Sequence, residues 1–404
     1  MKQNINVKQR FSFRLFILLL LPGLANAALF AEVAKLTPSN PIPFEAFGGS
    51  MDVYGNRAIV GAHNYDQEKA YAYIFIRDSI SGKWQEQQKI DLPEIQPSYA
   101  PSVAIRGDTA FIGINEAGTN GRGVVYTFKR NPSTKIWQQH MTVKPQDASY
   151  FEFGGSVDVY GDTLVVTAFD YDGAQGREFS TVYLFKENDR GQWQEQQKIT
   201  LQETTPIWNN VKARIDRNVI VVTDFGGDDE VPRGIVYIYE RNGSAGTWKR
   251  KKEIRSLPDG NALPTLGYEP IAVDRGTVVI GSVNLDENYS IFSGNAYVYN
   301  KLNSNWGVTS KLKGSSAKPR DEFGKSVYIE NSILVTGSKK GVYAFQQGSD
   351  GKWRERQKLL ASNMQPGDKF GRNVSLSWNT LLVHHLAKDF TRSVIVYEKT
   401  GARR

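Results

Sequence analysis

The sequence predicts an all-β fold, a seven-bladed β-propeller of four-stranded antiparallel blades whose last blade is closed by the N-terminal strand. Three observations lead to this prediction. Similar segments recur about every fifty residues, a spacing typical of stacked or radial arrays. Within each copy, polar and apolar residues alternate with period two between clusters of Gly, Asn, Ser and Asp, as in short strands. The last copy lacks a strand that the start of the chain can supply.

The repeat is clearest in two segments, each with FGGS, a Tyr-x-Phe strand and a Trp strand ending in WQEQQKI. The shared features of all copies are an aromatic-Gly entry, a short apolar strand, a Tyr-rich strand and a Trp strand. The turns between the first two strands are short and rich in Asn, Asp and Gly, which supply the positive φ of tight hairpins. The copies lie near residues 47–90, 99–143, 153–199, 208–254, 266–312, 323–359 and 370–397.

The seventh copy reaches Arg404 without a Trp strand. Residues 29–36 (LFAEVAKL) fit that place, because Phe30 aligns with Trp84 and Leu36 with Ile90. A first strand that completes the last sheet closes a ring and removes its open edges. A linear solenoid would instead need terminal capping repeats. We therefore expect residues 28–404 to form one domain, a closed propeller.

Residues 1–27 have the pattern of a secretory signal peptide. A basic segment (1–14) precedes the apolar run LFILLLL (15–21) and an A-x-A ending at Ala27. This run is shorter than the about 20 apolar residues that span a bilayer. We expect cleavage before Ala28, export to a bacterial periplasm or the extracellular medium, and no membrane insertion of the mature chain.

Composition excludes several classes of function. The chain has no cysteine, so it has no disulfide, thiolate nucleophile or Cys-ligated metal. The formal charge of +8 includes four basic residues of the signal segment, which leaves 46 Lys+Arg against 42 Asp+Glu. This small excess gives no reason to expect a nucleic-acid partner. No G-x-S-x-G, phosphate loop or H-E-x-x-H occurs, and no Ser/His/Asp arrangement is recognisable.

The repeats resemble the FG-GAP family, which also builds the propeller of integrin α chains. The matching motifs are FGGS (47–50 and 153–156), FGKS (323–326), FGRN (370–373) and VGA (60–62). The resemblance implies a propeller and, in many relatives, a calcium site of the form D-x-D-x-D-G between the first two strands. The turns here have only two or three residues with at most one Asp each, too short to wrap an ion that takes six to eight oxygens. We therefore expect neither a cofactor nor a metal at these turns.

Loops at one face of a propeller are the expected place for function, because the strands are scaffold. The second-to-third-strand loops, here called B–C loops, share that face with the connections between blades, the D–A loops. The candidate binding residues on this face are His63, Tyr65, Asp66, Asp170, Tyr171, Asp172, Asp224, Asp286 and His385. His63 and His385 belong to adjacent blades at similar B–C positions, so their convergence is a further hypothesis.

Three functions remain open. The first is an exported, non-enzymatic binding or adhesion-type propeller that presents its B–C and D–A loops to a protein or glycan partner. The second is an extracellular carbohydrate-active enzyme, a hydrolase or lyase, that uses loop carboxylates. The third is a structural subunit of a surface assembly. The sequence favours the first, because no catalytic motif accompanies the regular scaffold and its irregular polar loops.

Overall fold

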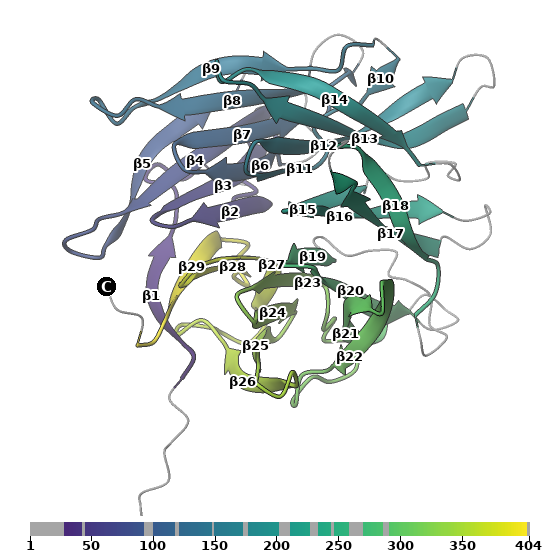
Figure 1. Cartoon of the computed structure of the whole chain (residues 1–404). Helices are drawn as coiled ribbons and strands as arrows, with labels where there is room; N and C mark the ends of the chain where they lie inside the picture. The colour runs from purple at the N-terminus through teal and green to yellow at the C-terminus, as the bar shows by residue number, and fades with distance from the viewer. Residues whose placement is uncertain are drawn as a thin grey trace, which may run out of the picture.

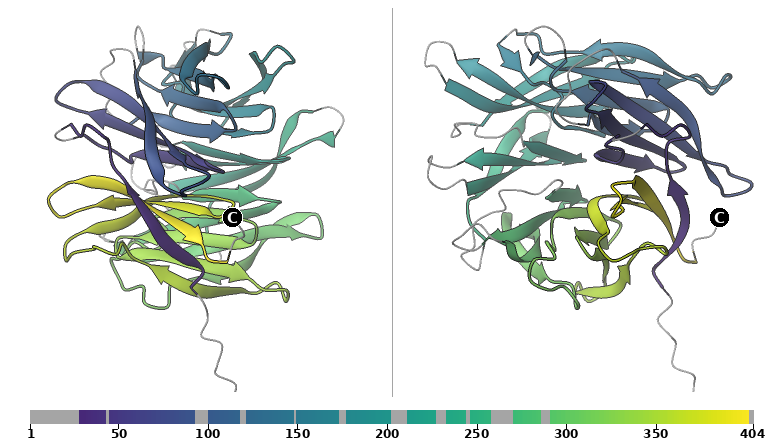
Figure 2. Two further views of the ribbon diagram at one scale, coloured as in Figure 1. Left: turned by 90° about the vertical axis from the view of Figure 1, so that its left-hand side faces the viewer. Right: turned by 180° about the vertical axis from the view of Figure 1, so that it is seen from behind.

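The computed structural model describes residues 28–42, 45–92, 100–117, 121–147, 149–172, 177–201, 211–226, 233–243, 246–257, 270–285 and 291–401. The predicted signal peptide, 1–27, lies outside these ranges. Figure 1 shows sheets arranged around a central axis, and Figure 2 shows the same ring from the side and from behind. None of the described segments is a helix long and apolar enough to cross a membrane.

Seven antiparallel sheets confirm the predicted propeller. In blades 1 to 6 the four strands run from the axis outward in chain order, and in blade 7 the N-terminal strand is outermost. Blade 1 holds β2 (Ser50–Tyr54), β3 (Arg57–Asn64), β4 (Lys69–Arg77) and β5 (Trp84–Asp91). Blade 2 holds β6 (Ser102–Arg106), β7 (Thr109–Ile114), β8 (Val124–Arg130) and β9 (Trp137–Val143). Blade 3 holds β11 (Val157–Tyr160), β12 (Thr163–Asp172), β13 (Arg177–Glu187) and β14 (Trp193–Thr200), with β10 (Tyr150–Phe151) added beside β12.

The second half of the ring repeats this plan. Blade 4 holds β15 (Lys212–Asp216), β16 (Val219–Gly226), β17 (Arg233–Arg241) and β18 (Trp248–Ile254); blade 5 holds β19 (Ile271–Asp274), β20 (Thr277–Leu285), β21 (Ile291–Leu302) and β22 (Asn305–Leu312); blade 6 holds β23 (Ser326–Glu330), β24 (Ile333–Ser338), β25 (Gly341–Gln347) and β26 (Trp353–Leu359); blade 7 holds β27 (Lys369–Ser377), β28 (Thr380–Leu386), β29 (Arg392–Lys399) and β1 (Phe30–Leu36).

The N-terminal strand closes the ring as predicted. β1 pairs antiparallel with β29, from Phe30 opposite Lys399 to Leu36 opposite Val394. The Gln357 side chain donates to the Phe30 carbonyl at 2.9 Å and accepts from the Phe30 N–H at 2.8 Å. Gln88 makes the same pair of bonds to the backbone of Trp137, between blades 1 and 2. Phe30 therefore occupies the place of a blade's Trp, as the alignment indicates.

The hydrophobic core consists of seven clusters, one between each pair of neighbouring blades. The cluster between blades 7 and 1, for example, joins Leu382 and Val394 to Phe47, Val60 and Tyr73. Each sheet is buried on both faces because a blade packs against two neighbours. The Trp residues that recur once per blade belong to these clusters, so they serve packing, as their regular spacing indicates.

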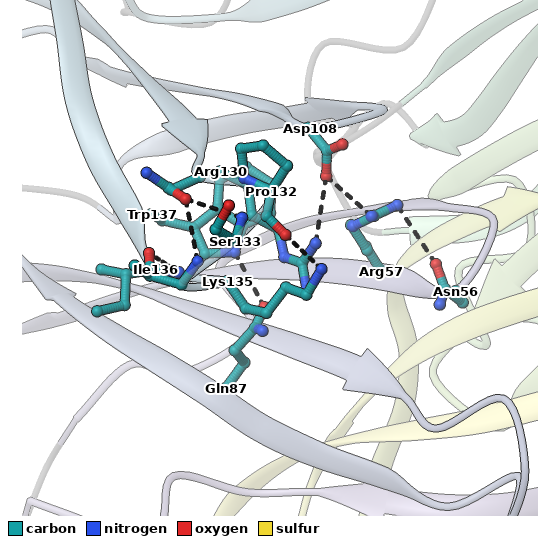
Figure 3. A network of polar contacts seen from close by, with 12 residues as sticks. Asn56, Arg57, Gln87, Asp108, Arg130, Pro132, Ser133, Lys135, Ile136 and Trp137 are labelled. Carbon is teal, nitrogen blue, oxygen red and sulfur yellow. Dashed lines mark hydrogen bonds and ion pairs between the residues drawn. The ribbon is translucent and has the colours of Figure 1, made fainter.

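Polar contacts also join neighbouring blades, as Figure 3 shows for blades 1 and 2. The Asp108 carboxylate of blade 2 lies 2.8 Å from the Arg57 guanidinium of blade 1 and 3.7 Å from that of Arg130. The Trp137 indole N–H donates to the Gln87 side chain at 3.0 Å. Such partly exposed ion pairs contribute little each, about 0–1 kcal/mol. The apolar clusters therefore hold the blades together, while the polar contacts fix their register.

We expect Phe30→Ala to lower the free energy of unfolding by about 3–5 kcal/mol, since it empties a fully buried aromatic site in the closing strand. Val33→Ala is the matched control on the same strand, because Val33 is 45% exposed, and it should cost no more than about 0.5 kcal/mol. Urea denaturation followed by tryptophan fluorescence measures both. Equal losses for the two variants would show that β1 does not close the ring by core packing.

Candidate functional site

The innermost strand of each blade lines a central channel. Successive inner strands contact one another around the ring, including β27 of blade 7 and β2 of blade 1. Because the strands are antiparallel, the B–C and D–A loops lie at one end of this channel, here called the loop face. The two-residue turns between first and second strands lie at the other end, here called the turn face.

A cavity of about 410 Å³ opens at the loop-face end of the channel. Its described lining carries four basic side chains, two histidines, two aromatic rings and one carboxylate. These residues are Lys212, Arg214, Arg372, Arg392, His63, His384, Tyr65, Phe169 and Glu152. The volume lies within the about 300–1,000 Å³ typical of small-ligand pockets. This cationic cavity, here called the loop-face cavity, is the candidate site.

Lys212 enters the cavity because it begins an inner strand. It pairs with Thr223 of β16, as Ser50 pairs with Gly61 and Ser326 with Gly337 in other blades. Blade 4 thus places a lysine where several blades place a serine. Burial, and then the charge of Arg214, lower the pKa of Lys212 from its usual 10.5 to about 8. Its ammonium has no ion-pair partner among the described residues.

Blade 7 contributes two guanidinium groups. Arg372 lies on β27 and Arg392 begins β29. Burial, and then the neighbouring Arg392 charge, lower the pKa of Arg372 to about 10. Burial also lowers the pKa of Arg392, against the opposing effect of Tyr65. The cavity therefore gathers positive charges that repel one another, an arrangement favourable to a negatively charged ligand.

Two neutral histidines line the cavity beside these cations. His63 is 5% exposed, and neither of its ring nitrogens has a hydrogen-bond partner among the described residues. Burial, and then the Arg392 charge, lower its pKa to about 4. His384 is also buried, and burial followed by the Arg372 and Arg392 charges lowers its pKa to about 3. Both imidazoles are therefore neutral at pH 7.

The channel changes character below this cavity. Asp52 and Asp158 lie around a small void of about 30 Å³ together with Arg214 and Tyr328. Burial raises the pKa of Asp158 to about 6, while the Arg214 charge opposes that shift. The charge of Arg214 therefore acts on the carboxylates of the channel interior, whereas Lys212 and Arg392 line the mouth of the channel.

The turn face has a second cavity, of about 320 Å³, where carboxylates of three successive blades meet the channel. Each carboxylate accepts a hydrogen bond from a backbone N–H of the next blade: Asp216 from Arg275 at 2.7 Å, Asp274 from Asn331 at 2.8 Å, and Glu330 from Trp378. These acidic side chains hold blades together, so their structural use explains their position.

The predicted site residues divide into two groups. His63 and Tyr65 line the loop-face cavity, and their rings meet edge to face with centroids 4.1 Å apart. Asp66 is exposed beside them. His385 does not line the cavity with His63: its ring is bonded to Asp368 at 3.0 Å, and its neighbour His384 lines the cavity instead.

The other predicted residues lie elsewhere. Asp170 is buried and accepts from Thr181 and Tyr183 at 2.7 Å, with the Lys198 ammonium at 2.9 Å. Asp224 is buried and accepts from the Ser180 hydroxyl at 2.7 Å. The Asp170 carboxylate stabilises its own sheet and that of Asp224 joins blades 3 and 4, so replacing them would report on folding as well as on binding. The side chains of Tyr171 and Asp172, and the whole of Asp286, lie outside the described part of the chain.

Sequence reasoning missed Lys212, Arg372, Arg392 and His384. The available signal was departure from the repeat. Arg372 stands in FGRN where two other copies read FGGS, and His384 stands where Gly61 stands in blade 1. A Cβ at Gly48 would lie only 2.5 Å from the His384 ring. The small residue at the entry of blade 1 therefore makes room for the imidazole of blade 7.

The turns between first and second strands have two residues in all seven blades, as between Tyr54 of β2 and Arg57 of β3. The expected absence of calcium from these turns remains a prediction. Within the described residues, no group of three or more His, Asp and Glu side chains is placed to hold a metal ion.

We expect Lys212→Met to stabilise the isolated protein by about 1–2 kcal/mol at pH 7. Because the folded-state pKa, about 8, is below the unfolded value, the charged lysine costs stability below that pH, and this cost disappears as pH rises toward about 10.5. Urea denaturation at pH 7 and at about pH 10.5 measures the gain in the free energy of unfolding. Lys249→Met, on the exposed outer strand β18, is the control and should change stability by less than about 0.5 kcal/mol. A destabilised Lys212→Met at pH 7 would contradict the assignment.

Comparisons with known proteins agree with the fold. The family model for the FG-GAP repeat matches residues 30–75 and 353–396. The two matches begin at Phe30 and Trp353, positions that are equivalent in the ring. A search of curated proteins finds no significant match.

Several solved structures share the architecture. A putative 6-phosphogluconolactonase from Bacteroides fragilis has a TM-score of 0.50 at 12% identity, over 90% of this chain and 94% of that one. The β-propeller domain of the Trilobed protease from Pyrococcus furiosus has a TM-score of 0.50 at 10% identity, over 90% and 96%. Acylaminoacyl peptidase from Pyrococcus horikoshii has a TM-score of 0.51 at 10% identity, over 88% of this chain but only 52% of the peptidase.

These identities are too low to carry more than the fold. The seven sheets identify the chain as a β-propeller, and two of its segments, 30–75 and 353–396, match the FG-GAP repeat.

Proposed function

We propose that this protein is an exported, non-enzymatic binding propeller, and that it holds a protein or glycan partner at the loop face. The observation that carries the proposal is the loop-face cavity. It is large and it opens where the irregular loops lie. It also contains polar groups that have no hydrogen-bond partner among the described residues, such as the two ring nitrogens of His63. Buried polar groups in native proteins are normally hydrogen-bonded, so their exposure to a cavity supports a ligand-binding role.

The enzyme alternative has less support from the same cavity. Glycoside hydrolases generally use a pair of carboxylates flanking the scissile bond, whereas the described lining has one, Glu152. The lactonase and peptidase named above share only the architecture, and a propeller can host unrelated functions. Binding without turnover is therefore the function we favour, in the periplasm or outside the cell.

A labelling experiment tests where partners bind. Because the chain has no cysteine, Asp66→Cys on the loop face and Asp162→Cys on the turn face can each be modified uniquely with a bulky maleimide. Asp66 and Asp162 are both exposed, so neither change should disturb folding. We expect the Asp66 adduct to abolish glycan-array or partner binding and the Asp162 adduct to leave it intact.

Binding that survives the Asp66 adduct and is lost with the Asp162 adduct would place the site at the turn face and contradict the proposal. Turnover of a bound polysaccharide that is lost in Glu152→Gln would establish the enzyme alternative instead.

A further inference from the structure

Two cations of the loop-face cavity, Lys212 and Arg392, carry charge that no described carboxylate neutralises. Lys212 and Arg392 line the cavity from opposite parts of the chain, blades 4 and 7, and neither has a carboxylate partner within ion-pairing distance among the described residues. By contrast, Lys198 pairs with Asp147 and Asp170, and Lys325 pairs with Glu322. Ion pairing is common elsewhere in this protein, so its absence from these two cavity cations is a local feature.

Neutral hydrogen-bonding groups stand beside these cations. Both nitrogens of His63 and Nδ1 of His384 lack partners among the described residues although the rings are about 95% buried. Leaving a buried polar group without a hydrogen bond lowers the stability of the protein. A ligand that accepts and donates hydrogen bonds at the cavity wall would recover part of that stability.

The rim adds an aromatic surface. Tyr65 is 55% exposed and lines the cavity next to His63. Asn115 and Ser156 supply further polar groups at the wall. An exposed aromatic ring beside charged and amide groups suits a ligand that has apolar C–H faces as well as polar substituents.

We propose that the loop-face cavity binds an acidic saccharide, such as a chain of uronic acid units, with Arg392 on the blade 7 side and Lys212 on the blade 4 side attracting its carboxylates, and Tyr65 packing on a sugar ring. This inference rests on the proposed binding function and specifies its ligand. Arg presents a planar fork that matches a carboxylate. A concave pocket of this volume fits a sugar unit, whereas a stable protein interface buries about 800 Å² per partner over a broader surface.

The binding should weaken in alkaline solution, because the cationic form of Lys212 is the one that attracts the anion. Burial holds the pKa of Lys212 at about 8. We therefore expect the affinity for the anion to be highest below that pH and to decline as pH rises through it. The charged and titratable groups that face Lys212 from the other cavity elements are Glu152, Arg214, Arg372, Arg392, Tyr65, His63 and His384. Both histidines are already neutral above pH 6, so Lys212 dominates the change between about pH 7 and 9.

Isothermal titration of the full mature protein with a short oligogalacturonate tests the inference. The matched probes are its fully methyl-esterified form, which keeps the sugar and removes the charge, and polyglutamate, which keeps the charge and removes the sugar. We expect the oligogalacturonate to bind at least about 10-fold more tightly than either, since one charge-assisted contact is worth about this factor. We expect Lys212→Met and Arg392→Met each to weaken it about 10-fold or more.

Two further variants separate charge at this site from general effects. Lys212→Arg keeps a charge that persists between pH 7 and 9, because even the buried Arg372 of this cavity has a pKa of about 10. This variant should therefore retain binding and lose the decline between pH 7 and 9. Arg217→Gln removes a charge at the turn face, far along the channel, and should leave the dissociation constant within about 2-fold.

Each other outcome overturns the inference in a recognisable way. Equal binding of the methyl ester would reject the carboxylate while leaving a glycan-binding propeller intact. Tighter binding of polyglutamate would point to an acidic protein partner instead. Failure of all three probes, with a neutral glycan still blocked by the Asp66 adduct, would refute only the ligand class. Failure of every probe together with an empty glycan array would refute the proposed function as well.

Discussion

The geometry of the channel depends on one hydrogen bond that recurs between several blades, from a residue at the loop-face end of an inner strand to the entry turn of the next blade. Ser102 donates to the Gly154 carbonyl at 2.6 Å and Ser326 to that of Gly371 at 2.9 Å. At the closure, Asn373 donates to the Gly49 carbonyl at 2.7 Å and also to that of Gly48. These bonds set the spacing of the inner strands. Ser50 and Ser102 at this position line the channel mouth, as Lys212 of blade 4 does.

This constraint explains why a single substitution changes the chemistry of the mouth. A serine at this position is used to hold the next blade, but Lys212 extends a charge into the cavity instead. Deeper in the channel, the Arg214 charge opposes the pKa rise of Asp52 and Asp158 that burial causes. The charges of Lys212 and Arg392 at the mouth have no such counterpart from a described carboxylate. The channel is thus balanced in its interior and cationic at its loop-face end.

The sequence predicted the fold well because every strand is repeated in several copies. An irregular copy can therefore be recognised by aligning it with the regular ones. The position of Phe30 in blade 7 follows from six Trp strands that share its place. The site was predicted only in part, because it is built from single residues that depart from the repeat. The polarity of the loops led to His63 and Tyr65, which line the cavity. It led also to Asp170, whose carboxylate accepts hydrogen bonds from Thr181 and Tyr183 within its own blade. Polarity in a loop does not tell whether a side chain turns outward or braces the sheet.

The central claim is that the loop-face cavity keeps polar groups unsatisfied until an anionic ligand enters. The most direct test is an NMR titration of the His63 ring, which is resolvable because the chain has only four histidines. With no ligand, His63 should titrate near pH 4, since burial and the Arg392 charge disfavour its protonation and lower its pKa. Saturation with oligogalacturonate should raise that pKa, because the bound carboxylate offsets the Arg392 charge. A ring that titrates near the ordinary value of about 6.5, with no response to the ligand, would contradict the account.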